Sequence, residues 1–172
     1  MTAIMRPLIW TAPEPFSVDV PLIVGALTMR SNVIQLHLTP GPEDHCQVVQ
    51  VVIDGRDLID LIRVLETPLA LAEDNPHLAG AYSGMALEKW RKGPAPAFDG
   101  WSPILDCECG TPDCWPFLTR INAGKNTITW SDFKQPFRPR WSYTGLGPFV
   151  FDRAQYQVEL QKLGCVLDPD RV

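Results

Sequence analysis

Short runs in which hydrophobic and polar residues alternate recur along this chain, a pattern of period two that is typical of β-strands. The clearest run is 33–38, where every second position from Ile34 to Leu38 is isoleucine or leucine. Further runs rich in β-branched or aromatic residues end at Gly, Pro or Asn, which favour turns. We expect strands over 20–29, 33–38, 48–53, 104–109, 115–121 and 127–130, and a short extended piece over 149–151. Short connections between the first three predict an antiparallel meander.

A helical pattern follows the third expected strand. Apolar residues spaced three and four positions apart define one face of a helix over 57–66: Leu58, Leu61, Ile62 and Leu65. Asp57 stands at the start of this run, where an N-cap residue is expected. Thr67 and Pro68 should end the helix, and Pro68 can then begin a second short helix that runs to Glu73.

The C-terminal part predicts one more helix. Asp152 is a suitable N-cap, and Gln155 follows it three residues later, as in a capping box. The apolar face of this helix consists of Tyr156, Leu160 and Leu163. Gly164 is a favourable C-terminal stop because glycine readily adopts a left-handed conformation.

Together these elements predict a single α+β domain over 1–172. We expect an antiparallel sheet of about six strands, with one central helix and one C-terminal helix packed on it. The composition is 45% hydrophobic and 20% charged, which is typical of a globular protein and unlike a disordered one. The sequence shows neither a signal-peptide pattern at its N-terminus nor an apolar run of membrane-spanning length. We therefore expect a cytoplasmic protein with reduced thiols that does not bind a membrane.

The formal net charge of −5 is unevenly distributed. Residues 1–86 contain four Lys and Arg residues against ten Asp and Glu residues, whereas residues 87–172 contain eleven against ten. An acidic balance disfavours nucleic-acid binding, which needs a basic face to neutralise phosphates. It suits a basic protein partner, for which we expect an acidic surface drawn from Glu43, Asp44, Asp60, Glu66, Glu73 and Asp74. The basic cluster at 89–92 is expected to be a solvated face.

The most unusual stretch is 106–117, which holds three of the five cysteines. On a straight strand Cys107 and Cys109 point to the same side. A four-residue loop over 110–113 would then place Cys114 opposite Cys109, so that all three sulfurs share one face. The same register puts Asp106 among apolar residues of the other face. Either the register breaks at the loop, or both faces of the hairpin are covered.

Three interpretations of these cysteines remain open. The first is a zinc site with Cys107, Cys109 and Cys114 as ligands, which requires a fourth ligand. Cys165 is the first choice for it, since it follows the last helix; the other candidates are Cys46, His45, His37 and His77. The second is a redox pair of Cys109 and Cys114, and the third, which we favour, is that the cysteines are small packing residues.

Three functional classes are considered for this chain: partner binding, metal binding and, third, catalysis. A cysteine nucleophile needs a base, and the three histidines all lie far upstream of the cysteines. Asp106, Glu108 and Asp113 could act as paired carboxylates, although acids in turns are commonly surface residues. No further catalytic motif is present.

Several motifs resemble those of a group of uncharacterised bacterial cytosolic proteins. The pattern Cys-x-Cys-Gly-x-x-x-Cys-Trp-Pro over 107–116 is followed by Trp-Ser-Asp-Phe over 130–133 and Gly-Pro-Phe-Val-Phe-Asp over 147–152. The resemblance covers roughly residues 54–164. It implies a bacterial source and carries no activity or catalytic residue with it.

The sequence thus favours a non-enzymatic domain that binds a protein partner, similar in class to an immunity or adaptor protein. The alternative is a metal-binding protein that uses the cysteine hairpin, with zinc as its only expected cofactor. Nothing in the sequence indicates the oligomeric state.

Overall fold

The computed structural model describes residues 31–41, 46–91, 99–111 and 113–165. The expected strand over 20–29 lies outside the described residues, as do His45, Glu43 and Asp44. Predictions for these residues are therefore not tested by the structure.

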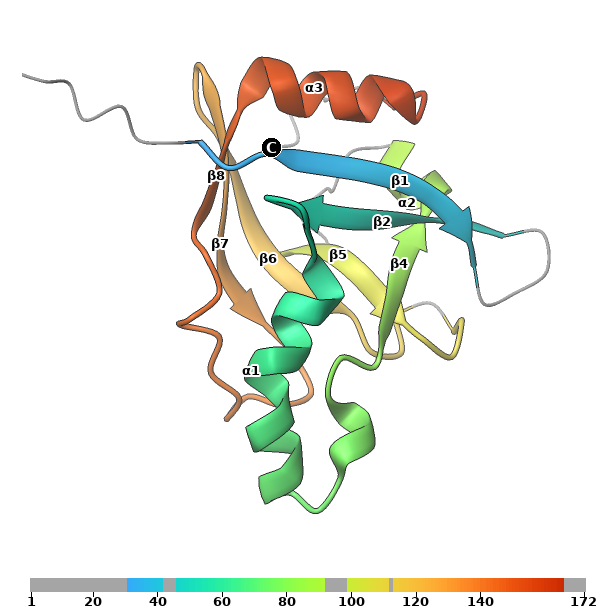
Figure 1. Ribbon diagram of the computed structural model, residues 1–172, viewed down its shortest axis with the longest axis vertical. Helices are drawn as coiled ribbons and strands as arrows, with labels where there is room; N and C mark the ends of the chain where they lie inside the picture. The colour runs from blue at the N-terminus through green and yellow to red at the C-terminus, as the bar shows by residue number, and fades with distance from the viewer. Residues whose placement is uncertain (1–30, 42–45, 92–98, 112, 166–172) are drawn as a thin grey trace, which may run out of the picture.

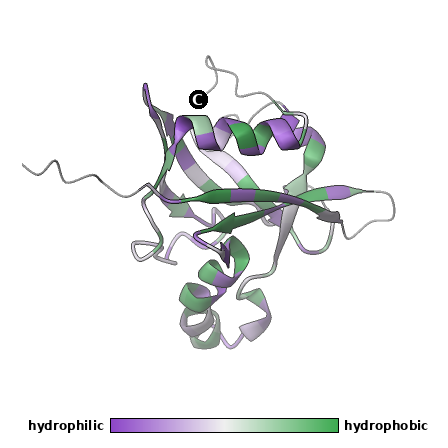
Figure 2. Cartoon of the chain, turned by 45° about the horizontal axis from the view of Figure 1, so that its top comes forward, coloured by the Kyte–Doolittle hydropathy of each residue, from purple (hydrophilic) through white to green (hydrophobic). Residues whose placement is uncertain are grey.

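The fold is α+β, as predicted, and is built on one antiparallel sheet with more strands than expected (Figure 1). The strand order is β1-β2-β4-β5-β6-β7-β8, and β3 pairs with β2. The strands are β1 (Ile34–Pro40), β2 (Gln47–Ile53), β3 (Arg56–Asp57), β4 (Tyr82–Ala86), β5 (Ser102–Cys107), β6 (Phe117–Ala123), β7 (Thr127–Lys134) and β8 (Phe149–Asp152). Hydrophobic and hydrophilic residues alternate visibly along β1 (Figure 2), where Ile34 and Leu36 are buried and Gln35 and His37 are exposed.

The two ends of this strand order come together. Asn32, just before β1, forms an isolated parallel bridge with Phe151 of β8. The Asn32 amide donates to the Val150 carbonyl over 2.6 Å, and the Asn32 side-chain oxygen accepts from the Val150 amide over 2.9 Å. The sheet therefore curls back on itself, and these contacts satisfy backbone groups that an open edge would expose.

Helix α1 (Leu58–Ala72) begins where the sequence predicts, because the Asp57 side chain accepts a hydrogen bond from the Ile59 amide. Leu58 and Ile62 are fully buried, while Leu61 and Leu65 are partly buried against the core. The predicted helix end at Thr67–Pro68 is wrong, since α1 continues through Pro68 to Ala72. Pro68 lies on the exposed side of the helix, where its ring does not disturb the packed face and water can replace the lost backbone bond.

Helix α3 (Arg153–Lys162) confirms the second prediction. The Asp152 carboxylate accepts from the Gln155 amide over 2.9 Å, and Tyr156, Leu160 and Leu163 are buried. Figure 1 shows α3 lying along β1. The buried Glu159 carboxylate links the two elements by accepting a hydrogen bond of 3.2 Å from the Leu36 amide.

Aromatic side chains form much of the core between the curled sheet and α3. Trp130 packs edge-on against Phe151 and Tyr156, with ring centroids 5.4 and 6.1 Å apart, and Trp90 lies 6.4 Å away. Trp90 belongs to the short helix α2 (Leu87–Arg91), and a 3₁₀ turn, η1 (Pro76–Leu78), precedes β4. None of the helices in the described ranges is both long and apolar enough to cross a lipid bilayer.

Candidate functional site

The three clustered cysteines lie at the start of the connection between β5 and β6, here called the cysteine loop (residues 108–116). Strand β5 ends at Cys107, and its last pairing with β6 joins Leu105 to Phe117. Cys109 and Cys114 therefore belong to the loop, so the predicted strands over 104–109 and 115–121 extend too far into it. Two explanations were offered for the position of Asp106 among apolar residues, and both hold. The register breaks at the loop, and both faces of β5 are covered, since every residue of this strand is buried.

The loop nevertheless gathers the three sulfurs as predicted. The sulfur atoms of Cys107, Cys109 and Cys114 all lie within 4.8 Å of one another, and those of Cys109 and Cys114 are 3.8 Å apart. A tight turn produces this arrangement, because the Gly110 amide donates to the Cys107 carbonyl over 3.2 Å and Gly110 has a φ of 81°. The Cys109 amide also points at the Cys107 sulfur over 3.4 Å. Glycine is suited to Gly110 because a side chain disfavours this left-handed conformation.

Lys89 of α2 links the end of β5 to the far part of the cysteine loop through two ion pairs. Its ammonium group lies 3.1 Å from a carboxylate oxygen of Asp106, just before Cys107, and 3.1 Å from one of Asp113, just before Cys114. Burial disfavours the charge on Lys89, but the hydrogen bonds to Asp113 and Asp106 outweigh it and raise the pKa of Lys89. Lys89 was expected on a solvated face, and local sequence does not indicate this role because its partners lie 17 and 24 residues away.

The thiols differ in acidity because their surroundings differ. Cys107 is buried, and desolvation together with its hydrogen bond to Cys109 raises its pKa to about 12. Cys109 is exposed, and hydrogen bonds to it from Cys107 and Thr111 lower its pKa to about 7. Cys109 is therefore the member of the cluster most readily present as a thiolate near neutral pH.

The structure does not bring the expected fourth ligand to this cluster. Cys165 is buried in the core after α3, and its thiol donates to the Leu163 carbonyl over 3.7 Å. No other Cys, His, Asp or Glu in the described part of the chain joins the three sulfurs, and this includes Cys46, His37 and His77. No histidine in the described part of the chain lies in this cluster. Asp106 and Asp113, considered as catalytic carboxylates, are both bound to Lys89.

Glu66, which was expected on an acidic binding surface, is fully buried, so this expectation is wrong. Its Oε1 accepts hydrogen bonds of 2.6 Å from the hydroxyls of Tyr82 and Tyr143, and its Oε2 accepts one of 2.7 Å from the Gly80 amide. Burial raises the pKa of Glu66, although all three hydrogen bonds oppose this shift. Glu66 thus joins α1 to β4 and to the loop over 135–148.

Two more of the expected acids also form contacts within the chain. Glu73 accepts a hydrogen bond of 2.9 Å from the Trp141 indole and forms an ion pair of 3.1 Å with Arg138. Asp60 is paired with Arg63 one helical turn away. Asp74 is exposed, and no ion pair among the described residues includes it.

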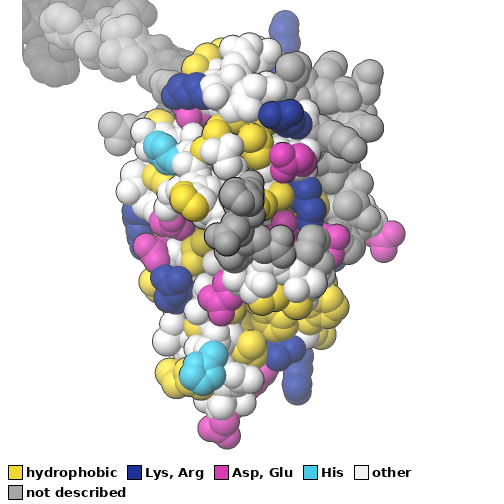
Figure 3. Space-filling view, turned by 90° about the vertical axis from the view of Figure 1, so that its right-hand side faces the viewer, with side chains coloured by type: hydrophobic (Ala, Val, Ile, Leu, Met, Phe, Trp, Pro, Cys, Tyr) yellow, Lys and Arg dark blue, Asp and Glu magenta, His cyan; other side chains and the backbone are white. Residues whose placement is uncertain are grey.

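Acidic side chains are interspersed with basic and hydrophobic ones on the face shown in Figure 3. That face shows no large patch of one sign. Binding of a basic partner therefore stays a prediction, which depends on Asp60, Asp74 and the two acids outside the described residues.

No protein-family model matches this chain, and comparisons with curated proteins and with solved structures find no significant match. The resemblance to a group of bacterial proteins is therefore untested, and the functional argument depends on the geometry alone.

Proposed function

We propose that this protein binds a thiophilic metal ion, Zn²⁺, through the thiolates of Cys107, Cys109 and Cys114. The observation that carries the proposal is the convergence of three sulfurs within 4.8 Å of one another, one from the end of β5 and two from the cysteine loop. Thiolate ligands favour soft or borderline metals such as zinc over magnesium or calcium.

The separation between sulfurs supports a tetrahedral site. Zn–S bonds of about 2.3 Å at tetrahedral angles separate two sulfurs by about 3.8 Å. The Cys109 and Cys114 sulfurs are 3.8 Å apart. An ion can therefore bridge these two thiolates at their present separation, and the Cys107 sulfur, within 4.8 Å of both, is the third ligand.

Three protein ligands leave the fourth position of a tetrahedral ion open. Cys109 and Cys114 are exposed to solvent, so water has access to that position. An open position distinguishes this proposed site from closed structural zinc sites, whose four ligands all come from the protein. Lys89 supports the site by holding both arms of the loop through Asp106 and Asp113.

Metal analysis of the purified protein tests the proposal. We expect about one equivalent of zinc in protein prepared without added metal, and its loss in the Cys107→Ser, Cys114→Ser double variant. Cys46→Ser is the matched control, because Cys46 is a partly exposed cysteine outside the cluster. This control should keep its zinc.

Cobalt substitution gives a second measurement. Co²⁺ bound by three thiolates shows sulfur-to-metal charge-transfer absorption and the intense visible bands of a tetrahedral ion. The wild type and Cys46→Ser should show these bands, whereas the double variant should not. Wild-type protein without bound metal and without these bands would overturn the proposal, as would equal zinc content in the double variant.

A further inference from the structure

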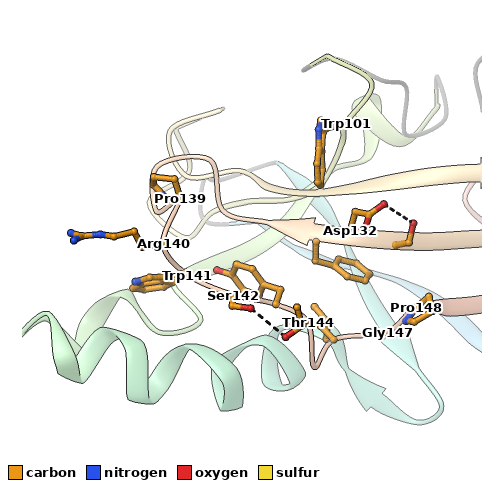
Figure 4. A pocket seen from close by; sticks show the side chains of 13 residues that line it. Trp101, Asp132, Pro139, Arg140, Trp141, Ser142, Thr144, Gly147 and Pro148 are labelled. Atoms are coloured by element: carbon orange, nitrogen blue, oxygen red, sulfur yellow. Dashed lines mark hydrogen bonds between the residues drawn. The ribbon is translucent and has the colours of Figure 1, made fainter.

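A cavity at the edge of the core has a lining that includes the core residues Phe133, Trp141 and Tyr143 and none of the three clustered cysteines. Its volume is about 650 Å³, which falls within the range of about 300–1,000 Å³ for small-molecule sites. It is formed by the end of β7, by the residue just before β5 and by the loop over 135–148 (Figure 4).

Flat aromatic surfaces form much of the lining. Trp101 lies on one side of the cavity and Trp141 on the other, with Phe133 and Tyr143 also in the lining (Figure 4). Trp101 is partly exposed, whereas the other three rings are buried. Hydrogen bonds to α1 hold two of these rings: the Trp141 indole donates to Glu73, and the Tyr143 hydroxyl donates to Glu66. The aromatic surfaces are therefore preorganised, which favours a planar ligand.

Asp132 supplies a carboxylate to the cavity from an unusual backbone position. It has a φ of 53° inside β7, where the pairing with β6 shifts register. A bulge of this kind redirects a side chain out of the regular alternation. The Asp132 side chain is exposed, and its hydrogen bond within the described residues comes from the Ser131 hydroxyl over 3.2 Å. It can therefore accept further hydrogen bonds from a ligand.

Arg140 lines the cavity, and two further cations, Lys134 and Arg120, lie against the Trp101 ring. The Lys134 ammonium and the Arg120 guanidinium lie 3.8 and 4.9 Å from the centre of the Trp101 ring, and Arg140 extends outward at the rim (Figure 4). None of these three residues takes part in an ion pair within the described ranges. In a protein of net charge −5, such a concentration of unpaired positive charge favours an anionic group at this place.

We infer that this cavity binds a planar anion whose ring carries N–H donors, the chemistry of a free guanine mononucleotide. The base would stack on the partly exposed ring of Trp101, and its N–H groups would donate to Asp132. The phosphate would lie near Lys134 and Arg120. The overall negative charge disfavours a nucleic-acid polymer, which would bring many phosphates to the surface.

Isothermal titration calorimetry with guanosine 5′-monophosphate as the probe tests this inference. Adenosine 5′-monophosphate, guanosine and ribose 5-phosphate serve as comparison ligands. We expect the guanine nucleotide to bind at least about tenfold more tightly than the adenine nucleotide, since adenine lacks the paired donors for a carboxylate. Ribose 5-phosphate should bind at least about tenfold more weakly, because it cannot stack.

Variants of the cavity make the test specific. Asp132→Asn should reduce guanine-nucleotide affinity at least about tenfold, and asparagine tolerates the positive φ, so the fold should be retained. Asp74→Asn is the matched control, because Asp74 is exposed with the same φ of 53° but does not line the cavity. The Arg120→Gln, Lys134→Gln double variant should weaken nucleotide binding and leave guanosine binding unchanged.

Three results would overturn the inference. The first is the absence of binding by folded wild-type protein at millimolar nucleotide. The second is equal affinity for ribose 5-phosphate and the guanine nucleotide, or an equal effect of Asp132→Asn and Asp74→Asn. The third is tighter binding of a single-stranded oligonucleotide than of the mononucleotide, which would assign the cavity to nucleic acid.

Discussion

Tyr143 and Glu66 lie 77 residues apart in the chain, and inside the folded protein the Tyr143 hydroxyl donates a hydrogen bond of 2.6 Å to Oε1 of Glu66. The contact fixes the loop over 135–148 to α1. Tyr82 donates to the same oxygen from β4, so one buried carboxylate holds three segments together. The rest of the loop is held in a similar way by Glu73, which binds Trp141 and Arg138.

The first prediction concerns these hydroxyl groups. Tyr143→Phe should lower the free energy of unfolding by about 1–3 kcal/mol, because the carboxylate loses a buried donor. Tyr156→Phe is the control, since the Tyr156 hydroxyl is buried and has no hydrogen-bond partner in the described ranges. Removing that hydroxyl should leave stability unchanged or raise it. Urea denaturation measures both, and equal losses would show that the Glu66 contact contributes nothing specific.

The second prediction is a pH dependence with a defined sign. Because burial raises the pKa of Glu66, the folded protein holds this proton more tightly than the unfolded chain does. Glu66 therefore favours folding at acidic pH, and its contribution is lost as the pH rises through the raised pKa. The Glu66→Gln variant has no ionisable group at this position, so it serves as the reference. The stability of the wild type relative to this variant should thus fall from acidic to neutral pH.

Urea denaturation of both proteins over this pH range measures the difference. A relative stability that rises with pH would mean that the hydrogen bonds from Tyr143, Tyr82 and Gly80 outweigh desolvation and depress the pKa.

Local signals explain what could be predicted from the sequence. Asp57 and Asp152 cap the helices they precede, because an N-cap depends on residues two or three positions away. The clustering of the three cysteine sulfurs also followed from short spacing. The loop geometry differed in detail, since β5 ends at Cys107 and the turn closed by the Gly110 amide follows at once, whereas a strand to Cys109 and a loop over 110–113 were predicted.

Other features depend on distant parts of the chain and could not be predicted. Strand β4 has no alternation and contains Gly84, which weakens a strand signal. The structure gives a reason for the glycine: a side chain at Gly84 would collide with the Val49 carbonyl of β2. The burial of Glu66 likewise depends on Tyr143, far along the sequence, so a charged residue on α1 was read as exposed.

The third prediction tests the core face of α1. Ile62→Ala should lower the free energy of unfolding by about 2–5 kcal/mol, because Ile62 is fully buried and its truncation leaves a cavity. Val64→Ala is the control, since Val64 is 66% exposed on the same helix, and its effect should stay within about 0.5 kcal/mol. Similar losses in both variants, measured by urea denaturation, would contradict the assignment of the core.

The fourth prediction assigns Lys89 as a positioning residue for the proposed zinc site. Lys89→Met should weaken zinc affinity about 10–100-fold, because the arms carrying Cys107 and Cys114 lose their common partner. Lys125→Met removes an exposed charge from the β6–β7 turn and should not change the affinity. Competition with a chromophoric chelator measures affinity, and thermal melting checks that both variants fold. An unchanged affinity in Lys89→Met would show that the loop is ordered without this bridge.

The fifth prediction concerns oxidation of the metal-free protein. Cys109 and Cys114 are exposed, and their sulfurs are 3.8 Å apart, whereas a disulfide requires about 2.05 Å. Side-chain rotation within the loop can close this gap. Hydrogen peroxide should convert the Cys109 thiol to a sulfenic acid with release of water. Attack by the Cys114 thiol would then form the disulfide and release a second water.

Peptide mapping by mass spectrometry without reductant should therefore find a Cys109–Cys114 disulfide in oxidised protein. Cys114→Ser should stop at the sulfenic acid, which dimedone traps, and Cys46→Ser should behave as the wild type. Bound zinc should slow the reaction, because it occupies the electron pairs of both thiolates. A disulfide that uses Cys107 instead, or links between separate molecules alone, would contradict the pairing that the 3.8 Å separation indicates.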